Sequence, residues 1–262
     1  MAANFWQSSH FKRWTFSKER IASLRAEMQS RTKFSTEKEL LVQAHFIQQI
    51  QNLGKKLNYK QIVIATAATY FKRFFLLTSV LDNDPRVVAP TVLYLAAKVE
   101  EMGQLRPEPI LTALDKIERA EYRIKPGELF LCEMVVLEKL QFDLVVFHPY
   151  QDIERFVVDS AQDVNNVFQI AWGILNDAQR GDCVIIYPPC IVALASMYVA
   201  CVHLDQDVKP WFDELNINAE QVRECVIDLL AWSKADEERP LKIDGVMKEL
   251  TIYWKSVKVA IV

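Results

Sequence analysis

The chain has 262 residues, of which 51% are hydrophobic and 25% are charged, and its formal net charge is −3. This composition supports a buried core and excludes a disordered chain. Only six residues are glycine, which argues against a Gly-rich nucleotide fold and against a turn-rich β architecture. The basic residues are scattered, so we predict no nucleic-acid partner.

The five cysteines never form a C-x-x-C motif, which indicates free thiols in a reducing compartment. No basic segment followed by an apolar stretch opens the chain, so we expect no secretory signal. Residues 183–202 carry no charge and reach the nominal length of a membrane-spanning helix. However, Pro188 and Pro189 interrupt the stretch near its start. A core helix after the prolines is therefore the better interpretation, and we predict no membrane contact.

Helix-start signals recur along the chain. Thr36 and Glu39 have the spacing of a capping box, and Asp84-Pro85 places an N-cap acid before a proline at the first helical position. Asn218 offers a further start. No segment shows a convincing strand pattern. The predicted helices span 18–29, 36–53, 60–79, 85–102, 107–120 and 125–141, followed by 149–161, 164–180, 188–204, 208–215, 219–234 and 242–258.

The two series of helices look related. The segment from Pro85 to Ala97 and the segment from Pro189 to Cys201 are separated by 104 residues, and both begin at a proline and end in small residues. Small residues let neighbouring helices approach closely. We therefore predict an all-α fold of two tandem five-helix repeats, each with one central helix wrapped by the others. The predicted boundary lies at 143–149, where a proline and a β-branched run interrupt the helical period.

No motif of a catalytic or metal site is present. The four histidines are far apart and show no metal-ligand spacing. No Gly-rich phosphate loop occurs, no serine lies in G-x-S-x-G, and no cysteine has a nearby histidine. We therefore predict no catalytic residues, no metal and no cofactor. An all-α enzyme stays open as an alternative, and it would require turnover by the purified chain alone.

Two charged residues stand out on otherwise apolar helix faces. Glu133 has apolar residues at its i±3 and i±4 positions, and Lys98 follows a nearly uncharged run. A carboxylate inside an apolar face is costly to desolvate unless a cation meets it. Lys98 could instead pair locally with Glu100 or Glu101, with Glu133 facing water. The alternative is that Lys98 and Glu133 lie together on an apolar patch and engage a partner. Val202 occupies the matching place in the second repeat, so only the first repeat would carry this feature.

Several motifs together resemble those of the cyclins, and most closely the transcriptional cyclins that pair with the Mediator-associated cyclin-dependent kinase. The likeness spans nearly the whole chain. It rests on 4–10 at the N-terminus, on 68–74, 93–101, 132–133 and 140–144 in the first repeat, and on 145–150, 171–177 and 187–189 in the second. It implies an N-terminal helical extension at 1–34, a first, kinase-binding cyclin box at 35–145, a second cyclin box at 146–236 and a C-terminal helix at 237–262.

The resemblance also implies a function. In cyclins, the residues at the places of Lys98 and Glu133 contact the kinase, and those at the places of Phe142 and Leu144 pack on its regulatory αC helix. Phe130 is predicted to add apolar contact, although a core role is an equal alternative. We therefore expect a nuclear, non-enzymatic subunit that activates a cyclin-dependent kinase of the Mediator kinase module. The alternative is a cyclin-fold scaffold or general-transcription-factor-like adaptor that binds DNA or peptides without activating a kinase.

Two further features have open interpretations. Trp172, Asn176 and Asp177 can share one helix face, either as a buried tryptophan with a cap or as a second docking surface for other subunits of the Mediator kinase module. The Phe5-Trp6 pair is expected to pack an N-terminal helix onto the first repeat, and contact with a partner is the alternative.

Overall fold

The computed structural model describes residues 4–103, 106–118, 123–160 and 164–260, and every regular element within these ranges is a helix. This confirms the predicted all-α class. The first helices are η1 (Phe5–Gln7), α1 (Ser9–Trp14), α2 (Lys18–Thr32), α3 (Thr36–Lys56), α4 (Gln61–Leu77), α5 (Pro85–Val99), α6 (Glu108–Glu118) and α7 (Pro126–Lys139). They are followed by α8 (Tyr150–Asp159), α9 (Val164–Ala178), α10 (Cys183–Ile186), α11 (Pro189–His203), α12 (Lys209–Glu214), α13 (Ala219–Glu237) and α14 (Arg239–Ala260). The last two residues predicted for the helix at 107–120, and residue 161 of that at 149–161, lie outside the described ranges.

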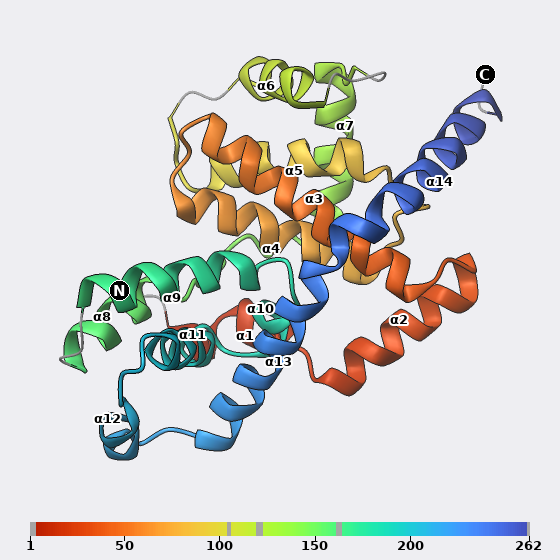
Figure 1. Ribbon diagram of the computed structural model, residues 1–262. Coiled ribbons are helices and arrows are strands. Elements are labelled where there is room, and N and C mark those ends of the chain that lie inside the picture. Colours follow the sequence, from red (N-terminus) through yellow and green to blue (C-terminus); the bar gives the residue numbers. More distant parts are fainter. Residues whose placement is uncertain (1–3, 104–105, 119–122, 161–163, 261–262) are drawn as a thin grey trace. The chain divides into compact units, whose positions relative to one another are not determined.

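The chain forms two compact units, each assembled from two stretches of sequence. The α5 unit consists of Ser17–Val146 and Glu238–Val262, and the α11 unit consists of Met1–Phe16 and Phe147–Glu237. Within the α5 unit, α5 packs against α3, α4 and α7 (Figure 1). Its buried Ala96 and Ala97 leave room for this close approach. The burial of nearly every side chain from Val88 to Ala97 makes α5 the core helix of this unit.

The α11 unit repeats this plan around its own central helix. α11 packs against α8, α9 and α13 (Figure 1), and its small residues Ala200 and Cys201 are fully buried. Like α5, it begins at a proline and is 15 residues long. The repeat predicted from the 104-residue offset is therefore present as two matching central helices.

Helix starts agree with the sequence in two of three cases. The Asp84 side chain accepts a hydrogen bond from the Arg86 amide at 3.0 Å, and Asn218 accepts one from the Gln221 amide at 3.1 Å. The capping box at Thr36 is wrong: α3 begins at Thr36 itself, and its N-cap Ser35 makes no side-chain cap bond. Glu39 accepts hydrogen bonds from the Ser79 hydroxyl and the Val80 amide instead.

The N-terminal segment packs within the α11 unit, so its expected packing onto the first repeat is wrong. The Phe5 ring lies 5.6 Å from that of Phe147, and the Phe147 amide donates to His10 Nδ1 at 3.0 Å. The Phe16 amide donates to the Ile185 carbonyl at 2.8 Å. These partners are remote in sequence, and local spacing carries no signal for them.

The C-terminal helix α14 packs against α3 in the α5 unit. Lys38 pairs with Glu249 at 2.6 Å, and Trp254 Nε1 donates to the Val80 carbonyl at 3.2 Å. Val80 lies in the turn that leads into α5. Both α14 and Glu39 of α3 therefore contact the turn at Ser79 and Val80 that leads into α5.

The uncharged stretch 183–202 is divided between α10 and α11. Within the described residues, none of the helices combines the length and the apolar character needed to cross a membrane. All five cysteines are free thiols.

Candidate docking surface

Lys98 of α5 and Glu133 of α7 meet where these two helices pack together. Lys98 Nζ forms an ion pair with Glu133 Oε1. Glu133 is buried, whereas the Lys98 side chain is 40% exposed and its Nζ lies 4.6 Å from the centre of the Tyr94 ring. The buried carboxylate thus has the cation that its desolvation requires. The local alternative for Lys98 is not observed: Glu100 accepts from the Thr66 hydroxyl at 2.7 Å.

The helix that carries Glu133, α7, also has exposed apolar side chains. The Phe130 ring lies 6.1 Å from that of Tyr94, so it extends the surface that Lys98 covers. The exposed apolar residues of this helix are Phe130, Leu131, Met134 and Val135. A helix of a protein without partners normally turns charged residues to water. The apolar outer face of α7 is therefore typical of a binding surface.

Phe142 and Leu144 follow the end of α7. Phe142 is 66% exposed and has a φ of 58°, in the left-handed region, after Gln141 with a φ of 51°. Its amide donates to the Leu137 carbonyl at 3.0 Å, which closes the end of the helix. A bulky residue at positive φ is an outlier that the surrounding structure must hold in place. An exposed aromatic ring held in this way is consistent with a binding role.

Two buried side chains of α4 hold the segment that follows Phe142. The Tyr70 hydroxyl donates to the Leu144 carbonyl, and Arg73 Nη1 lies 3.5 Å from the Asp143 carbonyl oxygen. Both side chains are fully buried. Neither residue is predicted as a site residue from the sequence, although a charged residue within the apolar run of α4 signals a buried partner.

Burial changes the titration of groups beneath this surface. Desolvation lowers the pKa of Arg73 to about 10, although Tyr70 and Asp143 favour its charged form. Desolvation raises the pKa of the Cys132 thiol, next to Glu133, to about 11. Arg73 therefore remains charged and Cys132 remains protonated at neutral pH. Cys132 is thus a packing residue and not a nucleophile.

The residues predicted as a second surface lie together on α9. The Trp172 ring stacks at 4.6 Å from Tyr150, and Asn176 Oδ1 accepts from the Tyr150 hydroxyl at 2.9 Å. Asp177 is exposed and pairs with Arg180 at 3.0 Å. Trp172 is half-buried.

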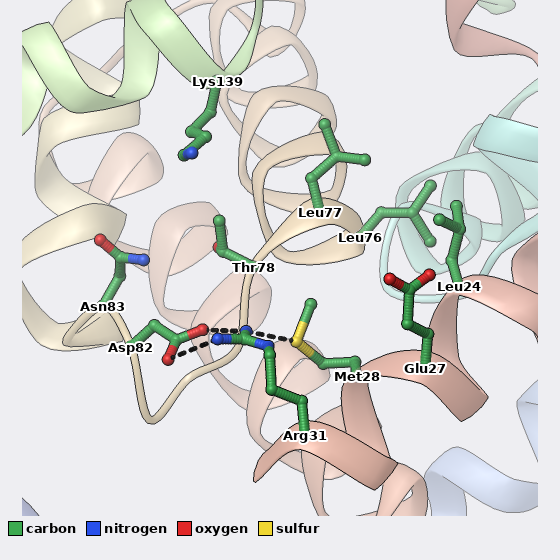
Figure 2. Close-up of a pocket in the computed structure, with 10 residues that line it drawn as sticks. All are labelled: Leu24, Glu27, Met28, Arg31, Leu76, Leu77, Thr78, Asp82, Asn83 and Lys139. Atoms are coloured by element: carbon green, nitrogen blue, oxygen red, sulfur yellow. Dashed lines mark hydrogen bonds and ion pairs between the residues drawn. The ribbon is translucent and has the colours of Figure 1, made fainter.

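A separate cavity of about 350 Å³ opens beside α2 in the α5 unit (Figure 2). Arg31 crosses it, forming an ion pair with Asp82 and contacting Met28 Sδ at 2.9 Å. Its lining residues are Leu24, Glu27, Met28, Arg31, Leu76, Leu77, Thr78, Asp82, Asn83 and Lys139. The predicted docking residues all lie outside this list. Within the described residues, no group of three or more His, Cys, Asp or Glu is arranged to hold a metal ion.

Comparison with known proteins identifies the fold and the family. Residues 16–145 match the model of the cyclin N-terminal domain. The chain is 36% identical to rat Cyclin-C over 254 residues, which cover 92% of this chain and 88% of the relative. It is 36% identical to Cyclin-C1-1 of Oryza sativa subsp. japonica over 95% of this chain and 98% of the relative. The chain therefore belongs to the cyclin family, in the cyclin C group.

Solved structures show the same fold. A chain of the CAK complex of Chaetomium thermophilum matches with a TM-score of 0.76 at 20% identity, covering 94% of this chain and 88% of that chain. A chain of the yeast TFIIK complex matches with a TM-score of 0.71 at 24% identity, covering 86% of this chain and 100% of that chain.

Proposed function

We propose that the chain is the regulatory subunit that binds and activates a cyclin-dependent kinase of the Mediator kinase module, and that it thereby regulates transcription by RNA polymerase II in the nucleus. The observation that carries the proposal is the Lys98–Glu133 ion pair, together with the exposed apolar side chains of α7 and of Phe142. Membership of the cyclin C group supports the kinase class. A further structural neighbour belongs, by its title, to the yeast RNA Pol II CTD kinase CTDK-1 complex.

The proposed mechanism is a population shift in the kinase. A kinase is active only when a glutamate of its αC helix pairs with a lysine of strand β3. Phe130, Phe142 and Leu144 would pack on αC, while Lys98 and Glu133 would bind polar groups at the edge of the contact. Because docking favours the arrangement with αC turned inward, binding energy stabilises the active state. The chain would supply no catalytic residue.

The Trp172, Asn176 and Asp177 face of α9 is proposed to contact another subunit of the Mediator kinase module. Its accessible features are the half-buried Trp172 ring and the exposed Asp177 carboxylate. The domain boundaries at 34, 145 and 236 stay predictions within this proposal.

The first experiment is co-purification of the chain with a Mediator-type cyclin-dependent kinase, followed by a kinase assay with and without the chain. We expect a one-to-one complex and raised kinase activity. A complex without activation would favour the scaffold alternative. Absence of a complex, both with the kinase alone and with the other module subunits present, would contradict the proposal.

Substitution of the ion pair locates the contact. Glu133→Ala or Lys98→Ala should weaken kinase association, because truncating a buried charge at an interface commonly costs about 2–5 kcal/mol. Glu224→Ala is the matched control, since Glu224 is an exposed acid on α13, the corresponding helix of the second repeat. Unchanged kinase affinity in both ion-pair variants, with the fold intact by circular dichroism, would remove these residues from the site.

A further inference from the structure

A row of aromatic side chains links three helices of the α11 unit. The Tyr198 ring meets the Phe212 ring edge-on at 5.6 Å, Phe212 lies 5.2 Å from Trp211, and Trp211 lies 6.0 Å from Phe156. Trp211 Nε1 also donates to Asp159 Oδ2 at 3.1 Å. The row therefore runs without interruption from α11 through α12 to α8.

This row is open to solvent. Tyr198 and Val202, one helical turn apart on α11, are both exposed, and Phe156, Trp211 and Phe212 are half-buried. Single exposed apolar residues are normal on a protein surface. Here, however, adjacent aromatic rings join the exposed turn of α11 into one continuous face. Aromatic residues are also those that contribute most to binding energy at protein interfaces.

The charges around the row are mostly negative. Among the described residues 154–159 and 202–214, six are acidic (Glu154, Asp159, Asp205, Asp207, Asp213 and Glu214) and two are basic (Arg155 and Lys209). All eight are exposed. Such a rim repels nucleic acid and anionic membranes, and it attracts cationic side chains. Arginine and lysine can also lie over the faces of tyrosine and tryptophan rings.

The last turn of α5 in the first repeat corresponds to the turn of α11 that carries this face. Tyr198 and Val202 occupy on α11 the places that Tyr94 and Lys98 occupy on α5, at the same offset of 104 residues. In the α5 unit, this turn carries the charged pair of the proposed kinase site. In the α11 unit, it is apolar and its rim is acidic. Two copies of one scaffold thus present different chemistry at the same turn.

We propose that the face formed by Tyr198, Val202, Trp211 and Phe212 docks a basic amphipathic helix of a partner protein. Apolar side chains of that helix lie on Tyr198 and Val202, and its lysines and arginines contact Asp213, Glu214 and the neighbouring acids. None of its residues belongs to the proposed kinase surface or to the proposed Trp172 surface. The proposal does not depend on the kinase assignment.

The test uses synthetic helical peptides and the full-length chain. The probe is a fluorescent amphipathic peptide of about 20 residues with a leucine stripe and lysine and arginine flanks, because such a helix presents both features that the face recognises. In a second peptide, glutamate replaces the basic residues, and in a third, serine replaces leucine. Fluorescence anisotropy is measured at physiological and at high ionic strength.

We expect the basic peptide to bind at least about tenfold more tightly than either matched peptide, and to weaken as salt is raised. Asp213→Lys with Glu214→Lys should weaken it by about tenfold, and Val202→Ser should weaken it by a few fold. The matched control is Glu224→Lys with Glu237→Lys, which reverses the charge of two exposed acids on α13. It changes the net charge by the same amount at a different place on the chain, so we expect it to change the peptide affinity by less than about twofold.

Equal loss in the α12 and α13 charge variants, or no preference for the basic peptide, would overturn the proposal. Self-association of the chain that Val202→Ser abolishes would overturn it as well, since the face would then bind a second copy. Kinase association is measured in parallel and should be unchanged by Asp213→Lys with Glu214→Lys. Loss of the kinase in that variant would assign the face to kinase docking and contradict a separate partner.

Discussion

Helices α5 and α11 hold the same position in the two repeats, yet their exposed last turns differ. Both are 15-residue helices that begin at a proline, and both bury small residues against their neighbours. In α5, Lys98 turns to Glu133 of α7 and to the Tyr94 ring. In α11, Val202 is 56% exposed, and the Tyr198 ring turns to Phe212 of α12.

This difference separates what the fold requires from what function requires. At Ala96 and Ala200, a larger side chain would push apart packed helices, so both repeats keep small residues there. At positions 98 and 202 the side chains are exposed, and the two repeats diverge in charge. Divergence at an exposed position of a shared scaffold therefore points to binding rather than to packing.

Helices α4 and α9 also hold corresponding positions in the two repeats, and one pair of matching residues on them differs in burial. Arg73 of α4 is fully buried and lies against the Asp143 carbonyl. The residue 104 positions later is Asp177 on α9, which is exposed and pairs with Arg180, two residues beyond the end of that helix. Arg180 is buried and also pairs with Asp236 of α13. The α4 side chain is buried against the segment that carries Phe142, whereas the α9 side chain is exposed and shares its arginine with Asp236.

The largest expected effect follows from this pair. Arg73→Ala should lower the free energy of unfolding by about 3–5 kcal/mol, because it removes a large buried side chain and leaves the polar groups around it without their partner. Asp177→Ala, the matched change in the other repeat, should cost at most about 0.5 kcal/mol, because the Asp177 side chain is exposed and Arg180 keeps its pair with Asp236. Urea denaturation followed by circular dichroism measures both. Similar losses in the two variants would contradict the contrast.

A second change makes α5 resemble α11. Lys98→Val leaves the buried Glu133 carboxylate without its cation, so we expect a loss of about 1–3 kcal/mol in the free energy of unfolding. Adding Glu133→Gln should recover most of that loss, because a neutral amide is less costly to bury. Kinase affinity should stay low in the double variant. Recovery of kinase binding together with stability would show that the pair serves packing alone.

Most of the helical framework is predictable from the sequence, because long apolar runs with helix-start signals define it locally. Asp84 and Asn218 cap α5 and α13 as expected. The capping box at Glu39 fails because a tertiary partner, the turn at Ser79 and Val80, takes the carboxylate. The predicted packing of Phe5 onto the first repeat is wrong for a similar reason, since its partner Phe147 is far away in sequence.

Some features of the candidate site can also be expected from the sequence, and others cannot. The meeting of Lys98 and Glu133 is one of the two outcomes that the sequence leaves open, because a carboxylate on an apolar face needs either a cation or contact with water. The roles of Tyr70 and Arg73 are not predictable, because both contact backbone carbonyls of the segment after α7. Any residue has such a carbonyl, so only the path of the chain decides which one is reached. The positive φ of Phe142 is hidden from the sequence for the same reason.

A pH measurement tests whether burial raises the pKa of Glu39 in the folded state. Desolvation raises the pKa of Glu39 above its ordinary value of 4.5, against the hydrogen bonds from Ser79 and Val80. Because the folded pKa is the higher one, the folded state holds this proton more tightly, and its stabilising contribution is lost as the pH rises through the folded pKa. The free energy of unfolding of Glu39→Gln, relative to that of the wild type, should therefore increase from pH 4 towards neutrality. This increase should be smaller than the loss in free energy of unfolding that Lys98→Val causes. A pH-independent difference would contradict the raised pKa.

The smallest expected effect comes from making α11 resemble α5. Val202→Lys should change the free energy of unfolding by less than about 0.5 kcal/mol, because the side chain is exposed. It should not create a second kinase site, because α13 carries no described acid that is buried beside Val202 as Glu133 is beside Lys98. Isothermal titration with the kinase should therefore give an unchanged stoichiometry. A second binding event would mean that a lysine at this turn is sufficient for docking, and that the buried carboxylate of α7 contributes packing rather than recognition.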